Sequence, residues 1–392
     1  MDQTAQFFFS PENRVAPLGI ITLEGAEELS EKIDAHLVRW AREAGMEVDT
    51  FRLDSSCPRF NSGDAKGIIS QTVRGYDLFI VVDVGNYSLT YPYFGMENHM
   101  SPDDHFQNLK RIIQAASGKP HRISVIMPTL YGGRQHRRNY RESLDGAFAL
   151  QELQRMGVEN VVTFDAHDPR VQNAVPLMGF DNLRPSYQVL KKMFRSFPDL
   201  VVDRDSFMVI SPDEGALDRN MYYASVMEVE MGMFYKRRDY SRMVDGRNPI
   251  VAHEYLGSDV VGKDVFVADD IISSGESMLD IAYNVKKRGA RRFFAFATFA
   301  IFAKGLEAFD KAYQEGMLDG VFGTNLTYRT EELKNRPWFY EVDMSKYISY
   351  YISALNHDMA ISRLIDPHEK MTALLERRRE EHGKYQHEQL SF

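Results

Sequence analysis

The sequence has one cysteine, two tryptophans and no long run of apolar residues. Because Cys57 is alone among 392 residues, an internal disulfide and a cysteine-rich zinc module are excluded. The longest apolar run, Phe293–Ala303, is interrupted by Thr298 and is shorter than the roughly 18 residues that span a bilayer. The first residues also carry no basic segment typical of a secretory signal. We therefore expect a cytoplasmic protein without a membrane segment.

Acidic residues outnumber basic residues in this sequence. The chain has 47 Lys and Arg against 56 Asp and Glu, a formal charge of −9. A general nucleic-acid binder needs a basic face to displace counterions from phosphates, so such a partner is not expected, although local basic pockets are compatible with this charge. With 44% hydrophobic and 26% charged residues the composition is that of a globular protein. At roughly 150 residues per domain, the length predicts two or three domains.

Short β-rich apolar runs alternate with amphipathic segments of helical length, which predicts an α/β fold with parallel strands. The expected strands are Leu18–Leu23, Leu78–Val84, Ser124–Met127, Val161–Phe164, Phe207–Ile210, Val265–Ala268 and Arg292–Ala297. The expected helices are Ala26–Glu43, Phe106–Ala116, Leu144–Met156, Gly215–Met231 and Ser277–Arg288.

Two stretches of the chain resemble each other. The pattern Val-x-Gly-x-Asp-x-Phe begins at Val73 and again at Val260, and each copy leads into an apolar strand that ends at an acid, Asp83 or Asp269. The pattern also describes a common turn before a strand, so the two interpretations stay open. A true repeat predicts two similarly built domains with a boundary near residues 181–198. The predicted divisions are 1–185, 186–366 and a charged tail, 367–392, expected to be a solvated, fraying helix end.

The strongest chemical signal lies between a predicted strand and a predicted helix. Residues 265–277 read Val-Phe-Val-Ala-Asp-Asp-Ile-Ile-Ser-Ser-Gly-Glu-Ser. Loop amides and a helix N-terminus bind phosphate, and hydroxyl side chains add donors. The paired acids Asp269 and Asp270 are suited to sugar hydroxyls or to Mg²⁺. The alternative is an ordinary helix start, with Ser273 as N-cap and Glu276 closing a capping box.

This segment resembles the ribose-5-phosphate loop of the ribose-phosphate diphosphokinases, the phosphoribosyl pyrophosphate synthetases. Other segments resemble motifs of the same family in the same order: Pro-Arg-Phe-Asn-Ser-Gly-Asp at 58–64, Tyr-Gly-Gly-Arg-Gln-His-Arg-Arg at 131–138, Thr-Phe-Asp-Ala-His at 163–167, Ser-Pro-Asp-Glu-Gly at 211–215 and Tyr-Lys-Arg-Arg at 235–238. The likeness extends over about residues 18–365. It implies two phosphoribosyltransferase-like α/β domains, each a mainly parallel sheet flanked by helices, with the active site between them.

The resemblance also implies a reaction and a set of site residues. The reaction is transfer of the diphosphoryl group of ATP to O1 of ribose 5-phosphate, with Mg²⁺ as cofactor, in a homo-oligomer. The implied catalytic residues are Lys236 and Arg238, and the implied metal ligands are His167 and Asp213. Those implied for ATP are Phe60, Ser62, Gly63, Asp64, Arg134 and Gln135. Those implied for ribose 5-phosphate are Asp269, Asp270, Ser273, Ser274, Gly275, Glu276 and Ser277.

Without the resemblance, these segments have plainer interpretations. The basic run from Lys236 has little apolar periodicity, which predicts a mobile loop with a solvated surface. Arg134 could belong to a charged loop before a helix, and His167 could be a hydrogen-bonded structural residue. Segment 58–64 is by itself only a turn.

Several positions depart from the family pattern. Ser273 and Glu276 stand where the family has Asp and Gly, and a carboxylate in a phosphate loop repels its ligand. Ser62 and Asp64 replace Asp and Glu in the nucleotide loop, and the aromatic segment 86–105 fits no motif.

Two other functions therefore stay open. One is a non-catalytic homologue that binds nucleotide and regulates an active partner. The other is a phosphoribosyltransferase, which shares the paired acids, although the Lys236 run and the Arg134-Gln135 motif speak against it.

Overall fold

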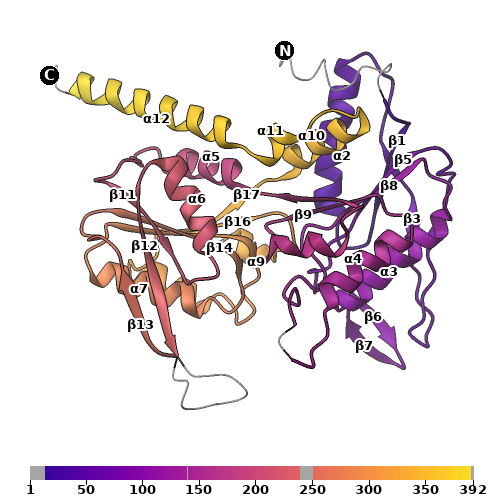
Figure 1. Ribbon diagram of the computed structural model, residues 1–392, viewed down its shortest axis with the longest axis horizontal. Helices are drawn as coiled ribbons and strands as arrows, with labels where there is room; N and C mark the ends of the chain where they lie inside the picture. Colours follow the sequence, from indigo (N-terminus) through magenta and orange to yellow (C-terminus); the bar gives the residue numbers. More distant parts are fainter. Residues whose placement is uncertain (1–13, 139, 239–249, 390–392) are drawn as a thin grey trace. The chain divides into compact units, whose positions relative to one another are not determined.

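The computed structural model describes residues 14–138, 140–238 and 250–389, and the chain divides into two compact units. Unit 1 comprises residues 1–184, 325–328 and 343–366, and unit 2 comprises residues 185–324, 329–342 and 367–392. Each unit is a sheet with helices packed on it (Figure 1). Within the described ranges no helix is long and apolar enough to cross a membrane.

Unit 1 is built on a parallel sheet with the strand order β10-β9-β8-β5-β1-β2. Its strands are β1 (Leu18–Thr22), β2 (Arg52–Leu53), β5 (Asp77–Val81), β8 (Arg122–Ile126), β9 (Asn160–Phe164) and β10 (Gly179–Leu183). The helices are α2 (Glu27–Glu43), α3 (Pro102–Ala116), α4 (Asp145–Arg155), α10 (Ser345–Asn356) and α11 (Ser362–Ile365), with the 3₁₀ turn η2 (Pro169–Ala174). Every residue of β5 is buried, as expected for a parallel strand covered on both faces.

Unit 2 has the order β13-β12-β11-β14-β15-β16-β17, in which only the pairing of β12 with β13 is antiparallel among the described strands. The strands are β11 (Phe207–Ser211), β12 (Glu230–Arg238), β13 (Ile250–Leu256), β14 (Asp264–Ile272), β15 (Arg292–Ala300), β16 (Gly320–Thr324) and β17 (Phe339–Val342). The helices are α5 (Ser186–Ser196), α6 (Leu217–Met227), α7 (Glu276–Lys287), α8 (Glu307–Gln314), α9 (Glu331–Lys334) and α12 (His368–Gln389). The predicted α/β fold class is confirmed. Each of the seven predicted strands and five predicted helices corresponds to an element of the structure.

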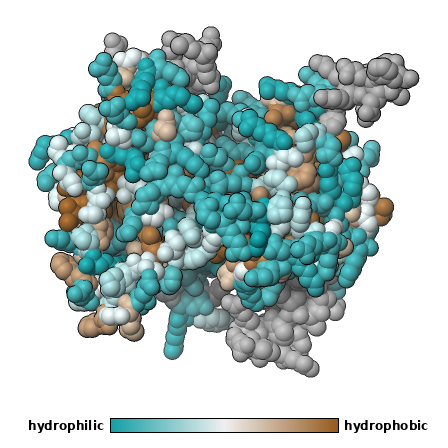
Figure 2. Space-filling model, turned by 180° about the vertical axis from the view of Figure 1, so that it is seen from behind, coloured by the Kyte–Doolittle hydropathy of each residue, from teal (hydrophilic) through white to brown (hydrophobic). Residues whose placement is uncertain are grey.

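The apolar side chains of each sheet and its helices form a core of their own. In unit 1 the core collects β5 and β8 with α3 and α4, and in unit 2 it collects β14 and β15 with α7 and α8. The face of the molecule in Figure 2 is mainly hydrophilic, with small and separate hydrophobic patches. Burial of apolar surface therefore accounts for each unit folding as a compact body.

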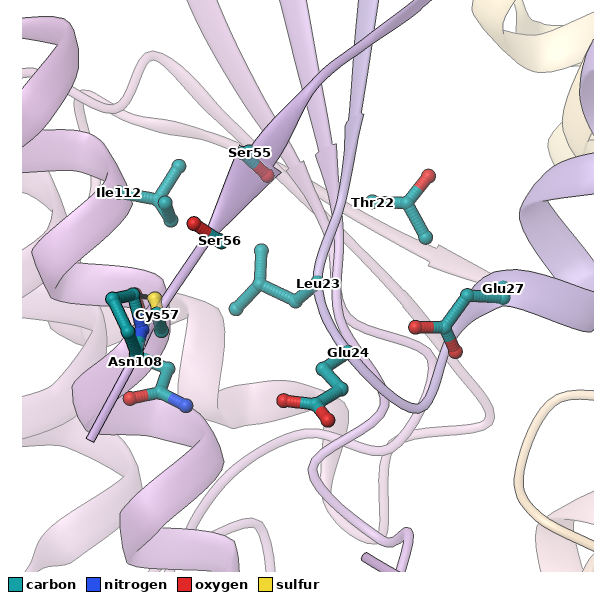
Figure 3. Close-up of a pocket in the computed structure, with 10 residues that line it drawn as sticks. Thr22, Leu23, Glu24, Glu27, Ser55, Ser56, Cys57, Asn108 and Ile112 are labelled. Carbon is teal, nitrogen blue, oxygen red and sulfur yellow. Dashed lines mark hydrogen bonds between the residues drawn. The ribbon is translucent and has the colours of Figure 1, made fainter. Parts of the chain in front are cut away.

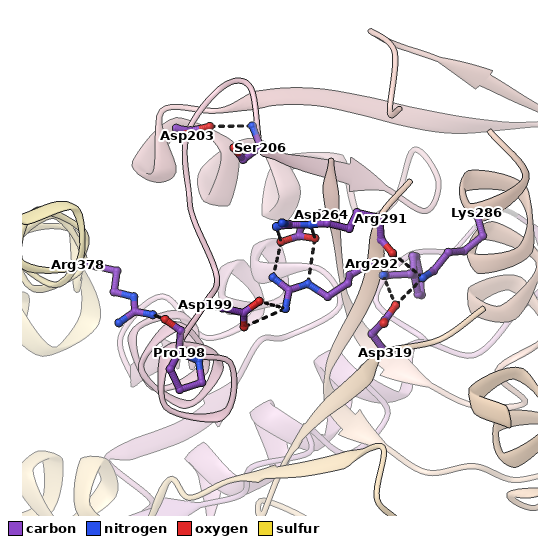
Figure 4. A network of polar contacts seen from close by, with 11 residues as sticks. Pro198, Asp199, Asp203, Ser206, Asp264, Lys286, Arg291, Arg292, Asp319 and Arg378 are labelled. Atoms are coloured by element: carbon purple, nitrogen blue, oxygen red, sulfur yellow. Dashed lines mark hydrogen bonds and ion pairs between the residues drawn. The ribbon is translucent and has the colours of Figure 1, made fainter. Parts of the chain in front are cut away.

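The repeated Val-x-Gly-x-Asp-x-Phe pattern marks equivalent strands in the two units. Asp77 begins β5 and pairs in register with Arg122 of β8, and their Oδ2 and Nη2 atoms are 2.7 Å apart. Asp264 begins β14 and pairs in register with Arg292 of β15, also at 2.7 Å. Both carboxylates are fully buried. Figure 4 shows Asp264 between Arg291 and Arg292. The pattern is thus a structural repeat and more than a turn.

Strand order reverses at the same place in both units. In unit 1 the chain runs from β1 to β2 on one side and then to β5 on the other, and in unit 2 from β11 to β12 and then to β14. In open α/β sheets such a reversal leaves a crevice at the carboxyl ends of the two central strands, where ligands bind. We therefore expect the chemistry of unit 2 at the ends of β11 and β14.

For residues 235–238 the expected loop is wrong, and the rest of the expected loop, with Arg242, lies outside the described residues. Residues 235–238 belong to β12, which pairs with β11 over its first half and with β13 over its second, where Lys236 lies opposite His253. Pairing with β13 supplies backbone hydrogen bonds for residues 235–238, which apolar periodicity did not predict. The expected helix Gly215–Met231 also ends early, because Glu228 is left-handed with φ 58° and turns the chain into β12.

The domain limits also differ from those predicted. Residues 343–366, expected in the second domain, belong to unit 1, where α10 packs against α2 and Tyr350 stacks on Trp40 at 4.5 Å. The charged tail belongs to unit 2, because α12 packs against α5 and α6 and buries Met371 and Leu375. Two apolar residues in a charged helix give too weak a periodicity for sequence reasoning to find.

The aromatic segment 86–105 contains a hairpin, β6 (Thr90–Tyr93) and β7 (Met96–His99). Its two turn residues, Phe94 and Gly95, have positive φ angles of 48° and 79°, as a two-residue turn between twisted strands requires. Two shorter strands, β3 (Ser55–Ser56) and β4 (Ile68–Ile69), form a second small antiparallel pair in unit 1.

Replacing Asp264 by Asn should destabilise unit 2 by about 2–4 kcal/mol, because it leaves two arginines without their buried counter-charge. Trp40 lies in unit 1 and Trp338 in unit 2, so a Trp40→Phe background makes tryptophan fluorescence report unit 2 alone. Urea unfolding then measures the change. Glu331→Gln removes an exposed ion pair of the same unit and should cost less than about 0.5 kcal/mol. Equal effects of the two variants would contradict the assigned role of Asp264.

Candidate functional site

Three carboxylates gather at the carboxyl ends of β11 and β14 in unit 2. Asp269 and Asp270 lie in β14, and Asp213 follows β11. Burial raises the pKa of Asp269 to about 8, and the charges of Asp270 and Asp213 act in the same direction. Arg219 of α6 opposes this shift, with Nη1 3.6 Å from an Asp269 oxygen. The site therefore holds an excess of negative charge that a cation or a hydroxyl-rich ligand would relieve.

Helix α6 fixes the end of β14. The buried Asn220 side chain donates to the carbonyls of Ala268 and Ala216, each at 2.8 Å, and accepts from the Ala268 amide at 3.0 Å. Asp213 Oδ1 accepts from the amides of Gly215 and Ala216 at 3.0 and 3.2 Å. Sequence reasoning missed Asn220 and Arg219, because two polar residues on an amphipathic helix carry no signal of their own.

The predicted phosphate loop, 273–277, connects β14 to α7. The helix begins at Glu276 and its N-cap is Gly275, with φ 79° and without a side-chain hydrogen bond. The alternative interpretation, a capping box with Ser273 as N-cap, is therefore wrong. A Cβ on Gly275 would lie 2.2 Å from Cε2 of the buried Phe309, so this close approach requires glycine. With no capping side chain over them, the first amides of α7 are placed to bind an anion.

Glu276 turns toward Lys304. Its Oε1 is 2.7 Å from Lys304 Nζ, and both side chains are mostly exposed. A hydrogen bond and the charge of Lys304 lower the pKa of Glu276. Lys304 is held near the loop because the Ala303 amide donates to the Ser273 carbonyl at 2.8 Å. The carboxylate that departs from the family pattern thus has a counter-charge, which sequence reasoning did not find because 28 residues separate the two.

Lys236 and Arg238 lie in the second half of β12. The last residue of β12 paired with β11 is Met233, opposite Ser211, two residues before Asp213. Lys236 follows Met233 by three residues along the strand. The basic segment thus lies on the strand beside the one that leads to Asp213, in the half of β12 that pairs with β13. Residues 239–249 lie outside the described residues.

In unit 1, Arg134 and Gln135 are exposed in a turn after β8. The Gln135 amide donates to the Gly132 carbonyl at 2.8 Å, and a Cβ on Gly132 would lie 2.7 Å from the amide nitrogen of Gly146 in α4. Tyr131 anchors the turn by stacking on Phe106 of α3, with ring centroids 4.2 Å apart. A rigid turn thus presents Arg134 to solvent.

His167 follows β9 and lies 5.4 Å from the ring of His136. His136 Nε2 is 3.5 Å from Asp168, whose pKa is lowered to about 2, mainly by its hydrogen bonds to Arg170. The predicted metal ligands His167 and Asp213 belong to different units. Among the described residues no group of three His, Cys, Asp or Glu side chains is arranged to hold a metal ion.

The predicted nucleotide loop is a tight turn in unit 1. The Phe60 amide donates to the Asp64 carbonyl at 2.7 Å, and the Gly63 amide donates to the Phe60 carbonyl at 2.8 Å. Ser62 Oγ donates to Asp64 Oδ2 at 2.9 Å, so these two polar side chains are engaged with each other. The Phe60 ring is 54% exposed. The turn therefore displays an aromatic face on a fixed backbone.

A cavity of about 320 Å³ lies beside the carboxyl end of β1 in unit 1 (Figure 3). Glu24, Glu27, Ser56 and Asn108 contribute to its lining, and none of the predicted site residues does. Its two carboxylates would repel phosphate groups. Burial raises the pKa of the Cys57 thiol in this cavity to about 11, so the thiol is protonated and unreactive at neutral pH.

Asp269→Asn should stabilise unit 2 increasingly as pH rises. An unfolded Asp ionises near 3.9, whereas in the folded protein the pKa of Asp269 is about 8, so wild-type stability falls between these values as pH increases. Asn cannot ionise, so the variant does not lose this stability as pH rises. Urea unfolding followed by Trp338 should give similar stabilities near pH 4.5 and a gain for Asn of about 1 kcal/mol or more at pH 9. A difference independent of pH would contradict the raised pKa.

Comparisons with known proteins agree with this architecture. Residues 18–157 match the family model of the N-terminal domain of ribose phosphate pyrophosphokinase, and residues 182–317 match that of the phosphoribosyl transferase domain. The ribose-phosphate pyrophosphokinase of Vibrio cholerae is 26% identical over 321 residues, covering 80% of this chain and 91% of that protein. The enzyme of the same name from Pasteurella multocida is 27% identical over 323 residues, covering 79% and 90%.

The fold is similar to that of a solved structure. The crystal structure of phosphoribosylpyrophosphate synthetase from Mycobacterium smegmatis aligns with a TM-score of 0.69 and 19% identity, covering 87% of this chain and 99% of that one. Both units are therefore matched in sequence and the chain as a whole is matched in fold. The chain belongs to the ribose-phosphate pyrophosphokinase family, as a divergent member.

Proposed function

We propose that the protein transfers the diphosphoryl group of ATP to O1 of ribose 5-phosphate, giving phosphoribosyl pyrophosphate and AMP. The observation that carries this proposal is the arrangement in unit 2, where paired acids lead directly into a glycine-capped helix N-terminus at the reversal of strand order. Acids beside free helix amides match a ligand with hydroxyls at one end and phosphate at the other.

In the proposed complex, Asp269 and Asp270 accept hydrogen bonds from the ribose hydroxyls, and residues 273–277 hold the 5-phosphate. Hydroxyl donors suit these carboxylates, because a hydrogen bond to the ionised form opposes the raised pKa of Asp269. The amides at the start of α7 and the hydroxyls of Ser273, Ser274 and Ser277 are the phosphate donors. Asn220 and Gly275 fix the two ends of this segment, which supports a site that needs little rearrangement on binding.

For the nucleotide, Phe60 offers a stacking face for adenine, and Arg134 and Gln135 offer donors for the triphosphate. Ser62, Gly63 and Asp64 shape the turn that carries Phe60. Lys236 and Arg238 are proposed to stabilise the charge that develops on phosphoryl oxygens as AMP leaves, since phosphoryl transfer depends mainly on positioning and electrostatics.

Mg²⁺ fits this site as a companion of the nucleotide. Mg²⁺ is usually held by one or two carboxylates together with substrate phosphates, and the acid cluster around Asp213 offers such a donor set. When bound, it would supply positive charge to the β- and γ-phosphate oxygens. His167 is the second proposed ligand. We further propose a cytoplasmic homo-oligomer.

A regulatory, non-catalytic homologue is the second candidate. The observation that favours it is the carboxylate of Glu276 beside the phosphate loop. The pairing with Lys304 favours catalysis instead, because it offsets the charge that would exclude the substrate.

A ³¹P NMR time course with ATP, Mg²⁺ and ribose 5-phosphate tests the two candidates. The wild-type protein should produce AMP and a new diphosphate ester only when the sugar is present. Lys236→Ala should lower kcat at least about 100-fold with a much smaller effect on the KM for ATP, as expected for a group that acts mainly in the transition state. A folded wild-type protein that binds ATP without turnover would favour the regulatory candidate. Undiminished turnover by Lys236→Ala would exclude its catalytic role.

Lys304→Ala should raise the KM for ribose 5-phosphate about tenfold, because it leaves the Glu276 carboxylate uncompensated beside an incoming phosphate. The KM for ATP should stay within about twofold. Glu276→Gln in the Lys304→Ala background removes the repelling charge and should restore most of the affinity. Steady-state kinetics of the single and double variants measure this coupling. Additive effects would show that the pair does not act on the substrate.

A further inference from the structure

The hairpin β6–β7 packs against the loop that carries Phe60. Arg59, which precedes Phe60, is the main link between them. Its guanidinium carbon lies 4.0 Å from the centroid of the Tyr91 ring, its Nη2 donates to Asp104 Oδ1 at 3.0 Å and its Nη1 donates to the Gly63 carbonyl at 3.1 Å. The side chain is only 10% exposed. One arginine thus joins the hairpin, helix α3 and the tip of the loop.

A second contact holds the tip of the loop. Gly63 has φ 90°, and a Cβ built on it would lie 2.7 Å from Cδ2 of Tyr93. The Phe94 amide also reaches the Asn61 carbonyl at 3.5 Å. The hairpin therefore covers one side of the loop directly, and only glycine at position 63 permits this approach.

A third contact joins the loop to helix α3. Asp104 holds Arg59 through one carboxylate oxygen, and its other oxygen accepts from the Ser101 amide and hydroxyl at 2.9 and 3.0 Å in the capping box of α3. The pair of Arg59 and Asp104 is mostly shielded from solvent, at 10% and 22% exposure. The loop is thus fastened to a helix whose apolar side chains pack in the core of unit 1.

We propose that Arg59, Tyr91 and Tyr93 are positioning residues that hold loop 60–64 in the conformation that presents Phe60 to the base of the nucleotide. This inference rests on the proposed function, in which Phe60 stacks on adenine. Phe60 keeps 54% of its surface exposed while the backbone on both sides of it is fixed. A pre-formed stacking face lowers the ordering cost of binding, so loss of the hairpin contacts should weaken nucleotide binding.

Arg59→Lys tests this role with the charge retained. A lysine ammonium cannot stack on Tyr91 and donate to both Asp104 and Gly63 in the fork geometry of a guanidinium. The KM for ATP should rise about tenfold, while the KM for ribose 5-phosphate stays within about twofold. Tyr93→Ala should act in the same direction. The matched control is Arg52→Lys, a partly exposed arginine of unit 1 that pairs with Glu31 and should change neither constant.

Hydrogen exchange of a peptide covering residues 58–66 gives a readout that needs no substrate. The amides of Phe60 and Gly63 are hydrogen-bonded within the loop and should exchange at least about tenfold faster in Arg59→Lys than in the wild type or Arg52→Lys. Unchanged exchange, an unchanged KM for ATP, or equal increases in both KM values would overturn the proposal.

Failure of the proposed function is distinguishable from failure of this inference. If the wild-type protein shows no turnover, diphosphoryl transfer is refuted, and calorimetric titration with Mg²⁺-ATP decides the role of Arg59. Binding weakened about tenfold in Arg59→Lys would still support the positioning role. Equal affinity of wild type and variant, or no binding to the wild type, would overturn it.

Discussion

A buried carboxylate–guanidinium pair at the start of the central strands sets the geometry of both units. Asp77 with Arg122, and Asp264 with Arg292, join the first residues of neighbouring parallel strands in register. Each carboxylate is fully buried, so an alternative register would leave a charge without a partner in the core. Because register fixes which residue reaches the far edge of a sheet, this pair also determines which side chains arrive at the carboxyl ends.

Six residues beyond each of these aspartates, another aspartate lies at the carboxyl end of the strand, and the two units use it differently. In unit 1, Asp83 accepts from the Thr327 hydroxyl at 3.1 Å and the Tyr328 amide at 2.9 Å. These hydrogen bonds of the Asp83 carboxylate hold residues 325–328 in place. In unit 2, Asp270 lies beside Asp269, whose pKa is strongly raised by burial and by its neighbour. The same scaffold thus gives a structural acid in one unit and a destabilised acid pair, suited to a ligand, in the other.

Local patterns and long-range contacts were not equally predictable from the sequence. Strands such as β5 are buried on both faces and appear as continuous apolar runs, so the central strands of both sheets could be found. The return of residues 343–366 to unit 1 depends on contacts such as Asn356 Nδ2 with Asp77 Oδ2 at 2.9 Å, which join positions 279 residues apart. Motif spacing likewise indicated Asp269 and Gly275. It did not indicate Arg219 or Lys304, because each of these residues is far in sequence from the acid that it contacts.

The residues that depart from the family pattern are better explained by the side chains they contact than by their own residue types. A glutamate at the start of α7 should by itself repel phosphate, yet Lys304 lies 2.7 Å from it. The predicted nucleotide loop has shorter polar side chains than the family pattern, and Ser62 and Asp64 bond to each other. Arg59 contacts the hairpin, α3 and the Gly63 carbonyl of the turn. At the start of α7 the changed residue has a counter-charge from another element, and in the loop at 60–64 the two changed residues bond to each other. Such compensation is expected where a loop conformation is retained, since an uncompensated charge or an unsupported turn would cost binding energy directly.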